Sequence, residues 1–365
     1  MINCAIREKY YQLHYCHTEK MQGTTMNTQT TIQASTIQIP DPPVIPDLTF
    51  RKFRGEVDYP AMLAVIEGSK ETDSIKRTDT LEDIVRNYEH LTNCDPYHDV
   101  LMAEINGQVI GYNRVFWEKL DDGTRTYTLF GFLLPAWRRR GIGGAMLHHA
   151  EQRLREIAAS HPEDGPRFFH SWAADTEIGT QRLLLSEGYQ PVRFSYEMVR
   201  DLSESIPEVP MPEGLELRSV KSEHFWLIFD AMNEAFRDHW SHRDMTKEEF
   251  KQWMKDPTFD PKHWKVAWDG DQVAGMVLNF INAAENEEYK RKRGYTEGIS
   301  VRRLWRRRGL ARSLLLQSLR YFEQLGMTEA ALDVDTDNPS GALRLYESAG
   351  FHPVKHYIDY RKPLK

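Results

Sequence analysis

The sequence lacks several features that would define other protein classes. Its three cysteines, Cys4, Cys16 and Cys94, form no CxxC pair, which argues against a disulfide framework. No run approaches the ~18 apolar residues of a membrane-spanning helix. No apolar signal segment stands at the N-terminus, so we expect a cytoplasmic protein. With 47 Lys and Arg against 54 Asp and Glu, the net charge is −7, which argues against nucleic-acid or anionic-membrane partners.

The 365 residues are 40% hydrophobic and 11% aromatic, a composition typical of folded domains, and their number suggests more than one. Residues 21–47 are rich in Thr, Gln and Pro, so we expect residues 1–47 to form a disordered leader or an extended arm. Residues 202–214 hold three prolines within six positions and are expected to be a linker. The predicted domains are therefore 48–201 and 215–365.

The two halves of the sequence repeat each other. Trp137-Arg-Arg-Arg-Gly-Ile-Gly143 recurs as Trp305-Arg-Arg-Arg-Gly-Leu-Ala311, 168 residues later. Two further pairs of segments correspond, namely Asn106 to Gly111 with Gly270 to Gly275, and Arg182 to Tyr189 with Arg344 to Phe351. A duplicated domain is the simplest explanation.

Each half shows the same order of predicted elements. The expected strands and hairpins lie at 48–53, 100–117, 126–134 and 168–173 in the first half, and at 215–220, 264–280, 295–301 and 329–334 in the second. An amphipathic helix follows each Arg-rich turn, because apolar residues recur there at helical spacing. The pattern predicts a mixed α/β fold.

The Arg-rich turn is the strongest functional signal. A strand that enters a helix through such a turn presents backbone N–H groups at a helix N-terminus, where an anion such as a pyrophosphate is favoured. Gly141 and Gly309 allow close backbone approach. A single RRRG run is weak, but its recurrence in one context strengthens it. The P-loop, the dinucleotide GxGxxG motif and the GxSxG elbow are all missing from these turns.

The turns match the motif [RQ]-x-x-G-x-[GA], and the second half adds N-x-x-[AG]-x-x-x-Y-x-x-x-G-F from Asn338 to Phe351. On these motifs the chain resembles a tandem GCN5-related N-acetyltransferase (GNAT), with a two-domain layout similar to that of mycothiol synthase. The resemblance covers about 48–200 and 215–363. It implies two tandem GNAT domains, each a mixed, mostly antiparallel sheet flanked by helices, and an enzyme that transfers an acetyl group from acetyl-CoA to a primary amine.

The resemblance also implies which residues bind acetyl-CoA. In the second half these are Ile299, Val301, Arg306, Arg307, Arg308, Gly309, Leu310, Ala311, Arg312 and Asn338. In the first half they are Arg138, Arg139, Arg140, Gly141, Ile142 and Gly143. The segment from Ile299 to Val301 would supply the backbone N–H that meets the thioester carbonyl.

Amine acetylation needs a proton acceptor for the amine and a proton donor for the leaving thiolate. Glu297 is placed to be the acceptor, and Tyr346 matches the family's general-acid tyrosine. Applying the repeat, Glu297 corresponds to Leu129 and Tyr346 to Leu184, and a leucine transfers no proton. We therefore predict that the C-terminal domain catalyses and that the N-terminal domain is degenerate in catalysis.

In this superfamily the segment between the first two strands usually contacts the acceptor, which suggests Asp238, His239 and Trp240 here. The net charge favours a small cationic amine. The spacing of His239 and His242 is compatible with a metal ligand pair, but no carboxylate or thiol cluster completes it, so no metal site is expected.

Two other readings remain. The chain could be a non-catalytic acyl-CoA-binding sensor or scaffold, although a pure binder needs neither Glu297 nor Tyr346. The arginines could form a nucleic-acid surface, which the acidic composition makes the weakest reading. Either a monomer or a homodimer is compatible with the sequence.

Overall fold

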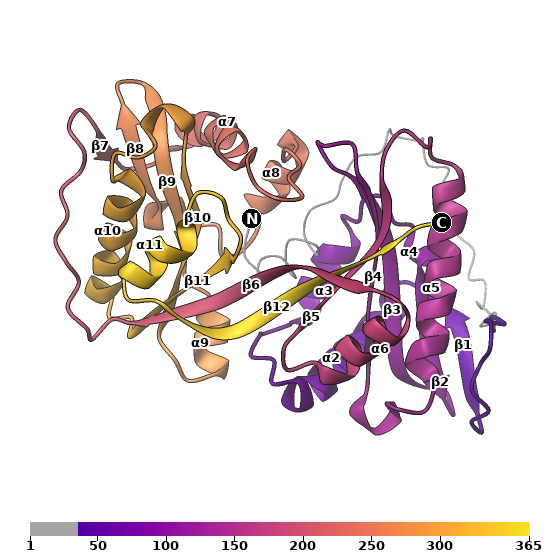
Figure 1. Cartoon of the computed structure of the whole chain (residues 1–365). Coiled ribbons are helices and arrows are strands. Elements are labelled where there is room, and N and C mark those ends of the chain that lie inside the picture. Colours follow the sequence, from indigo (N-terminus) through magenta and orange to yellow (C-terminus); the bar gives the residue numbers. More distant parts are fainter. Residues whose placement is uncertain (1–35) are drawn as a thin grey trace, which may run out of the picture. The chain divides into compact units, whose positions relative to one another are not determined.

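The computed structural model describes residues 36–365 (Figure 1). Most of the predicted leader, with Cys4 and Cys16, lies outside the described residues. The described chain forms two compact units. The N-terminal unit comprises residues 36–192 and Asp359–Lys365, and the C-terminal unit comprises Arg193–Ile358. In the part of the chain that is described, no helix is long and apolar enough to cross a membrane.

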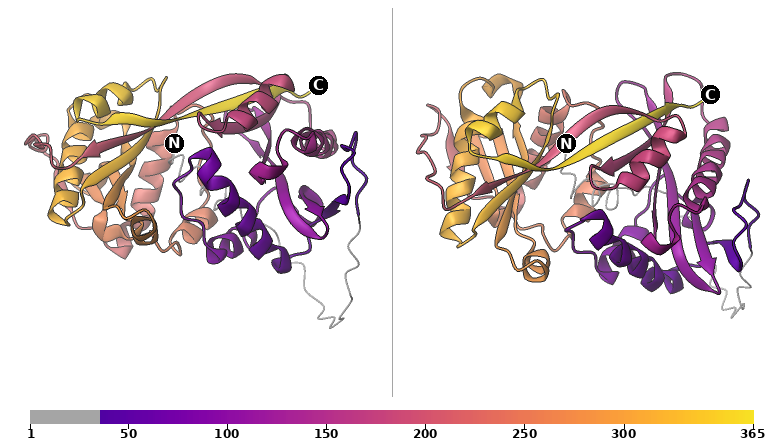
Figure 2. Two further views of the ribbon diagram at one scale, coloured as in Figure 1. Left: turned by 90° about the horizontal axis from the view of Figure 1, so that it is seen from below. Right: turned by 60° about the horizontal axis from the view of Figure 1, so that its bottom comes forward.

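The N-terminal unit contains five complete strands in the order β1-β2-β3-β4-β5. The strands are β1 (Leu48–Lys52), β2 (Val100–Ile105), β3 (Gln108–Lys119), β4 (Arg125–Leu133) and β5 (Arg167–Ala174). The helices are α2 (Tyr59–Asp73), α3 (Leu81–Tyr88), α4 (Pro96–Asp99), α5 (Ile142–Ala159) and α6 (Ile178–Ser186). Helices α2 and α3 pack on one face of this sheet, and α5 packs on the other (Figure 2).

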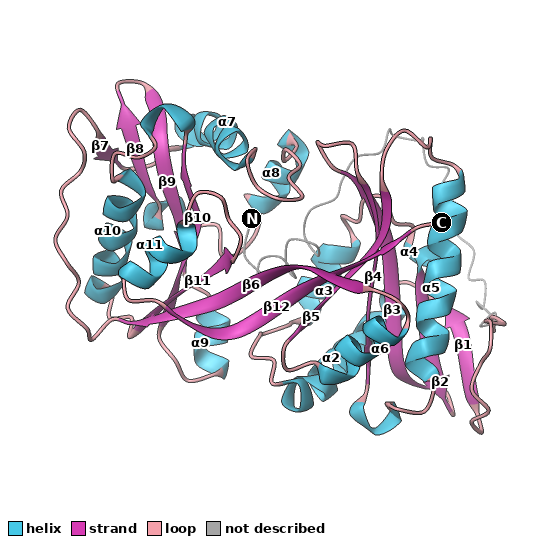
Figure 3. Ribbon diagram, in the orientation of Figure 1, coloured by secondary structure: helices cyan, strands magenta, loops and turns pink. Residues whose placement is uncertain are grey.

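The C-terminal unit repeats this plan, with the sheet order β6-β11-β10-β9-β8-β7. Its strands are β6 (Gln190–Asp201), β7 (Glu216–Arg218), β8 (Lys265–Asp269), β9 (Gln272–Phe280), β10 (Arg293–Val301), β11 (Glu329–Asp335) and β12 (His352–Pro363). Its helices are α7 (Phe225–Phe236), α8 (Lys247–Trp253), α9 (Ala283–Glu288), α10 (Leu310–Gln324) and α11 (Ala342–Ser348). Helices α7 and α8 pack on one face, and α10 and α11 pack on the other (Figure 3).

Both sheets are mixed, which confirms the predicted fold class. Most neighbouring strands are antiparallel, but β4 pairs with β5 and β10 pairs with β11 in parallel. These parallel ladders are short and end at Thr128 with His170 and at Tyr295 with Ala331. Beyond these residues the strands separate, and this separation lies at the centre of the candidate site.

Part of the last strand of each half belongs to the unit of the other half. Strand β6 precedes the linker in sequence, yet its residues from Ser195 to Asp201 pair with β11 of the C-terminal unit. The end of β12, Asp359–Lys365, belongs to the N-terminal unit, where the Leu364 N–H donates to the Arg167 carbonyl at 3.0 Å. The boundaries of the two units therefore differ from those of the predicted domains, which meet at the linker of residues 202–214.

Part of the predicted leader is ordered against the N-terminal unit. The Ile37 N–H donates to the Phe50 carbonyl at 2.7 Å, and Ile39 is 6% exposed. We call residues 37–46 the arm. The segment Ile39-Pro40-Asp41 of the arm recurs as Ile206-Pro207-Glu208 in the predicted linker, so the repeat also includes the segment before each first strand.

The exchanged end of β12 supports a prediction about stability. Asp359 accepts a hydrogen bond from His170 Nε2 at 3.0 Å, and the two side chains are 1% and 3% exposed. Replacing Asp359 by Ala leaves the imidazole buried without this partner, so we expect the free energy of unfolding of the N-terminal unit to fall by about 2–4 kcal/mol. Asp359→Asn keeps an acceptor oxygen, so the free energy of unfolding should fall less in this variant.

Hydrogen exchange at the β5 amides, together with thermal unfolding, measures this loss. Lys365→Ala, a change of an exposed residue near the same end of the chain, is the control. Equal stability of the Asp359→Ala and Lys365→Ala proteins would contradict the structural role assigned to the exchanged strand.

Candidate active site

The two Arg-rich loops have the same backbone conformation. Arg139 and Arg307 have φ values of 62° and 61°, and Gly141 and Gly309 have φ values of 86° and 81°. Each glycine is the residue before a helix, α5 or α10, and its carbonyl accepts the first helical hydrogen bond. Both loops therefore end with backbone N–H groups at a helix N-terminus, the arrangement that binds pyrophosphate. We call residues 138–143 and 306–311 the anion loops.

The first arginine of each motif holds the loop together. Arg306 Nε donates to the Val301 carbonyl at 2.9 Å, and its Nη1 pairs with Asp238 at 2.5 Å. In the N-terminal unit, Arg138 donates to the Leu133 carbonyl at 2.8 Å and makes a bidentate pair with Asp73 at 2.6 and 2.7 Å. Bidentate and charge-assisted contacts of this kind fix a side chain strongly.

The other residues predicted to bind acetyl-CoA differ in their exposure and in their hydrogen-bond partners. Arg307 and Arg308 are exposed, whereas Arg312 donates to Ser348 Oγ at 2.7 Å. Asn338 accepts hydrogen bonds from the Ser340 amide and hydroxyl at 2.9 and 2.7 Å. In the N-terminal unit, Arg139 is exposed, and Arg140 lies 4.8 Å from the centre of the Trp137 ring. Leu310 and Ile142 are buried, while the side chains of Ala311 and Gly143 are small.

Strand β10 contains a β-bulge that is absent from β4. Glu297 is paired with Leu278 and Ser300 with Met276, so Gly298 and Ile299 together occupy one position of the ladder. Gly298 has a φ of 54°, and a Cβ there would lie 2.8 Å from the Leu278 side chain, so only glycine fits. The bulge leaves backbone groups of β10 outside the β9 ladder where β10 separates from β11. Reasoning from sequence named Ile299 but missed Gly298.

Glu297 and Tyr346 come from opposite sides of the strand separation. Glu297 lies on β10, two residues beyond the end of the parallel ladder, and is 5% exposed. Tyr346 lies on α11, which follows β11, and is 6% exposed. Burial, and then the nearby Glu297 charge, raise the pKa of Tyr346, so its phenol keeps its proton at neutral pH.

The register of the N-terminal unit corrects one prediction. Counting from the end of the parallel ladder, the residue equivalent to Glu297 is Phe130, not Leu129. The offset of 168 fails on this side of the turn because the bulge adds one residue to β10. The Phe130 ring stacks on Trp172 of β5 with ring centroids 5.5 Å apart. Neither ring can transfer a proton.

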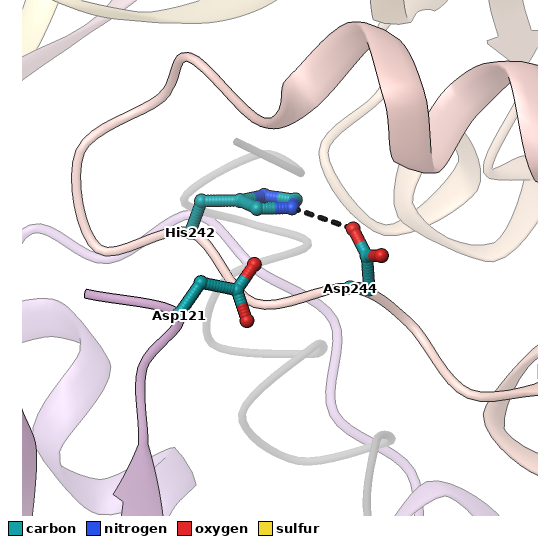
Figure 4. Close-up of side chains that lie close together, drawn as sticks. All are labelled: Asp121, His242 and Asp244. Carbon is teal, nitrogen blue, oxygen red and sulfur yellow. Dashed lines mark hydrogen bonds and ion pairs between the residues drawn. The ribbon is translucent and has the colours of Figure 1, made fainter. Parts of the chain in front are cut away.

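The three predicted acceptor contacts, Asp238, His239 and Trp240, have different surroundings in the structure. Asp238 is bound to Arg303 and Arg306, whose hydrogen bonds lower its pKa to about 2. The His239 ring lies 4.8 Å from the Phe236 ring, and burial lowers the His239 pKa, so the imidazole is neutral at pH 7. Trp240 lies beneath Arg193, with 5.6 Å between the guanidinium and the ring centre. His242 Nε2 contacts the Asp244 carboxylate at 2.9 Å (Figure 4).

The sheet face that carries Glu297 is acidic. Tyr295, Ala331 and Val199 pack together on this face. Because side chains alternate along a strand, the next row on the same face holds Glu297, Asp333 and Glu197. Asp335 follows and pairs with Arg193 at 2.8 Å. Sequence reasoning missed this set, because it depends on the pairing of strands that are distant in sequence.

Comparisons with known proteins agree with these features. The family described as "Acetyltransferase (GNAT) family" matches residues 64–161 and 225–351. A mycothiol acetyltransferase of Geodermatophilus obscurus is 30% identical over 266 residues, covering 72% of this chain and 80% of the relative. One of Thermobispora bispora is 30% identical over 232 residues, covering 62% of this chain and 73% of the relative.

The chain belongs to the acetyltransferase (GNAT) family. Two solved structures share its fold. A GCN5-related N-acetyltransferase from Sphaerobacter thermophilus has a TM-score of 0.68 at 24% identity, covering 89% of this chain and 97% of that one. A tandem GNAT protein from the clavulanic acid biosynthesis pathway has a TM-score of 0.62 at 16% identity, covering 87% and 98%. Membership of this family, rather than the shared fold, makes the chain an N-acetyltransferase with acetyl-CoA as its acyl donor.

The loop of the C-terminal unit of this GNAT protein fits such a donor. Within the described part of the chain, and apart from the neighbours of Gly309 in sequence, no atom lies within 4 Å of the position that a Cβ on Gly309 would take. Gly309 is also exposed, so its backbone is accessible. The exposed Arg307 and Arg308 add positive charge beside the N-terminus of α10. Because Arg306 is held by Asp238 and by carbonyl oxygens, the backbone N–H groups, rather than this guanidinium, are available to a pyrophosphate.

The Asp238 contacts predict an effect on donor binding. Asp238→Ala removes the anion that holds Arg303 and Arg306, so we expect the Kd for CoA to rise about tenfold, which corresponds to the loss of about 1.4 kcal/mol. The low pKa of Asp238 keeps it ionised above about pH 2, and an unfolded Asp titrates near 3.9. The effect should therefore be constant from pH 5 to 8.

Calorimetric titration with CoA measures this change. Asp230→Ala, on the exposed side of α7, removes a carboxylate of the same segment and serves as the control. If both variants bound CoA as the unmodified protein does, the role assigned to the Asp238 contacts would be wrong.

Proposed function

We propose that the C-terminal unit transfers an acetyl group from acetyl-CoA to a primary amine of a small cationic molecule, by direct attack of the amine. The observation that carries this proposal is the pairing of Glu297 and Tyr346 at the separation of β10 and β11, beside an accessible anion loop. The N-terminal unit has Phe130 and Leu184 at these places and lacks both proton-transfer groups.

Glu297 accepts the proton that the amine must lose, directly or through water. A free alkylammonium group titrates near 10.4, so at pH 7 almost all of it is protonated and cannot attack. The carboxylate of Glu297 lies on the acidic sheet face, where it attracts the ammonium form and then takes its proton. The Gly298 bulge sets the position of Glu297 at the end of the ladder.

Tyr346 supplies a proton to the departing sulfur. A thiol titrates near 8.5 and a phenol near 10. Burial and the Glu297 charge raise the phenol pKa further, so Tyr346 is a donor throughout the working pH range. Tyr346 packs with Leu332 and Val334 on one face of β11, whereas Glu297 follows Tyr295 on the other face of the sheet. This supports separate roles for the two residues as proton donor and proton acceptor.

The bulge of β10 supplies the polar contact for the carbonyl. Gly298 and Ile299 share one ladder position, so β10 can turn a backbone N–H into the gap between β10 and β11. Such a fixed dipole stabilises negative charge that develops on an oxygen. When bound, acetyl-CoA supplies the activated thioester carbonyl that the amine attacks.

The acidic face supports a cationic acceptor. Glu297, Asp333 and Glu197 form one row of carboxylates, and Arg293 pairs with Glu197 at 2.7 Å. The similar proteins named mycothiol acetyltransferases make a mycothiol-type amine one candidate acceptor. Diamines, polyamines and amino sugars are the other candidates that share the required charge.

Conservative substitutions of the two proton-transfer residues test the proposal. We expect Tyr346→Phe to lower kcat about a hundredfold or more, with little change in KM for acetyl-CoA, because only proton donation is removed. Glu297→Gln should lower kcat most at pH 7 and regain rate as the pH approaches 10, because more amine is then already neutral.

Steady-state kinetics over pH 6–10 provide the measurement. Tyr97→Phe makes the same chemical change at a tyrosine of the N-terminal unit that is 53% exposed and should leave kcat unaltered. If the Tyr346→Phe protein kept its full kcat, Tyr346 would not be the proton donor of the reaction.

The acceptor charge is tested separately at Asp333. Asp333→Asn keeps the shape of the side chain but removes one negative charge, so we expect the KM of a diamine to rise about tenfold while the KM of acetyl-CoA is retained. Asp337→Asn, at an exposed residue just beyond β11, is the control. Equal KM values for neutral and cationic amines, insensitive to salt, would contradict a cationic acceptor.

A further inference from the structure

The two anion loops share a backbone conformation but differ in what covers them. Pro43 of the arm lies over the loop of the N-terminal unit, with its Cβ 3.3 Å from the position that a Cβ on Gly141 would occupy. At the equivalent glycine of the C-terminal unit, Gly309, no other part of residues 36–365 apart from its chain neighbours lies within 4 Å of that position. Arm and loop belong to the same unit.

The arm is anchored on both sides of Pro43. Ile39 is 6% exposed and packs in a cluster with Phe50 of β1 and with Ile142 and Met146 of α5. Ile45 packs against the same cluster, whereas Val44 between these anchors is fully exposed. The arm also contains four prolines, at 40, 42, 43 and 46. Because proline restricts the unfolded backbone, ordering the arm costs less conformational entropy than ordering a flexible segment.

The equivalent segment of the C-terminal unit follows a different course. Met211 packs against the cluster that contains Leu310 and Leu314 of α10, and the Val209 carbonyl accepts from Ser313 Oγ at 3.4 Å. This segment therefore lies along the helix and leaves Gly309 open. A repeated sequence thus covers one loop and not the other.

We propose that the arm is a strap that excludes CoA from the N-terminal unit, so that the chain binds a single CoA molecule, in its C-terminal unit. A pyrophosphate must contact the backbone N–H groups that follow Gly141, and the Pro43 ring lies against this glycine. A proline has no N–H to offer the phosphate in exchange. Asp41 and Asp47, which are exposed and lie before and after Pro43 in sequence, also repel a polyanion such as CoA.

The strand separation of the N-terminal unit is closed as well. Phe130 of β4 and Trp172 of β5 stack where the C-terminal unit has Glu297 and Asp333. Phe132 packs edge-on against Phe130, with ring centroids 6.3 Å apart. An aromatic stack in this place stabilises the unit and leaves less room for a ligand between the strands.

Counting bound CoA by native mass spectrometry tests the strap. The double variant Ile39→Asp/Ile45→Asp places two charges in the apolar anchor and should release the arm. Val44→Asp adds a charge to the same arm at its exposed residue and is the matched control. We expect one CoA on the unmodified chain, one on the Val44→Asp protein and two on the double variant. Adding Gly309→Trp should lower each count by one.

Two CoA molecules on the unmodified chain would overturn the proposal. So would a single CoA on a double variant whose arm is shown to be free by rapid proteolysis within residues 37–46. If the unmodified chain bound no CoA, the proposed function would fail, and the double variant would still decide the strap by binding one CoA or none.

Hydrogen exchange covers the case in which the double variant does not fold. In the unmodified chain, CoA should protect the amides of residues 309–313 and leave those of residues 141–145 unchanged. Protection of both loops would contradict the strap without the use of any variant.

Discussion

The site depends on one constraint, which is the end of the parallel ladder between β10 and β11 at Tyr295 and Ala331. Beyond this pair the parallel ladder ends, so the backbone groups of β10 and β11 are no longer paired with each other. The β-bulge at Gly298 shifts the register of β10 at this point, directly after Glu297. Tyr346 lies buried on the helix that follows β11.

The N-terminal unit shows what the same architecture does without these groups. Its ladder ends in the equivalent place, but β4 has no bulge in its pairing with β3, and the rings of Phe130 and Trp172 stack just beyond the end of the ladder. Its anion loop keeps the same backbone angles and the same type of arginine–aspartate pair, Arg138 with Asp73. The same loop conformation therefore occurs in both units, although only the C-terminal unit has a glutamate and a tyrosine beside the end of its ladder.

Local features of the sequence predicted much of this arrangement. The repeated Arg-rich turns, the helices after them and the mixed sheets follow from residue periodicity and from short motifs, which depend on neighbouring residues. The acidic row with Asp333 and the exchange of β6 and β12 depend on strand pairing across long distances in sequence, so no local pattern indicated them. Leu129 was matched to Glu297 in error because the bulge adds one residue.

Two signals for the missed features were nevertheless present. Gly298 is a glycine inside a strand pattern, which is typical of a bulge. Ile39-Pro40 recurs as Ile206-Pro207 at an offset of 167 residues, which indicates that the segment before the first strand is part of the repeated unit rather than a disordered leader. Both features become visible only when the two halves of the sequence are compared residue by residue outside the Arg-rich turn.

The most direct test of the central claim, that the C-terminal unit performs the chemistry, is a crystal structure of the protein with CoA bound. We expect CoA at the loop of Gly309, with its sulfur within hydrogen-bonding reach of the Tyr346 hydroxyl, at about 3–4 Å. A CoA molecule whose sulfur lies far from Tyr346, or one bound at the loop of Gly141 alone, would contradict it.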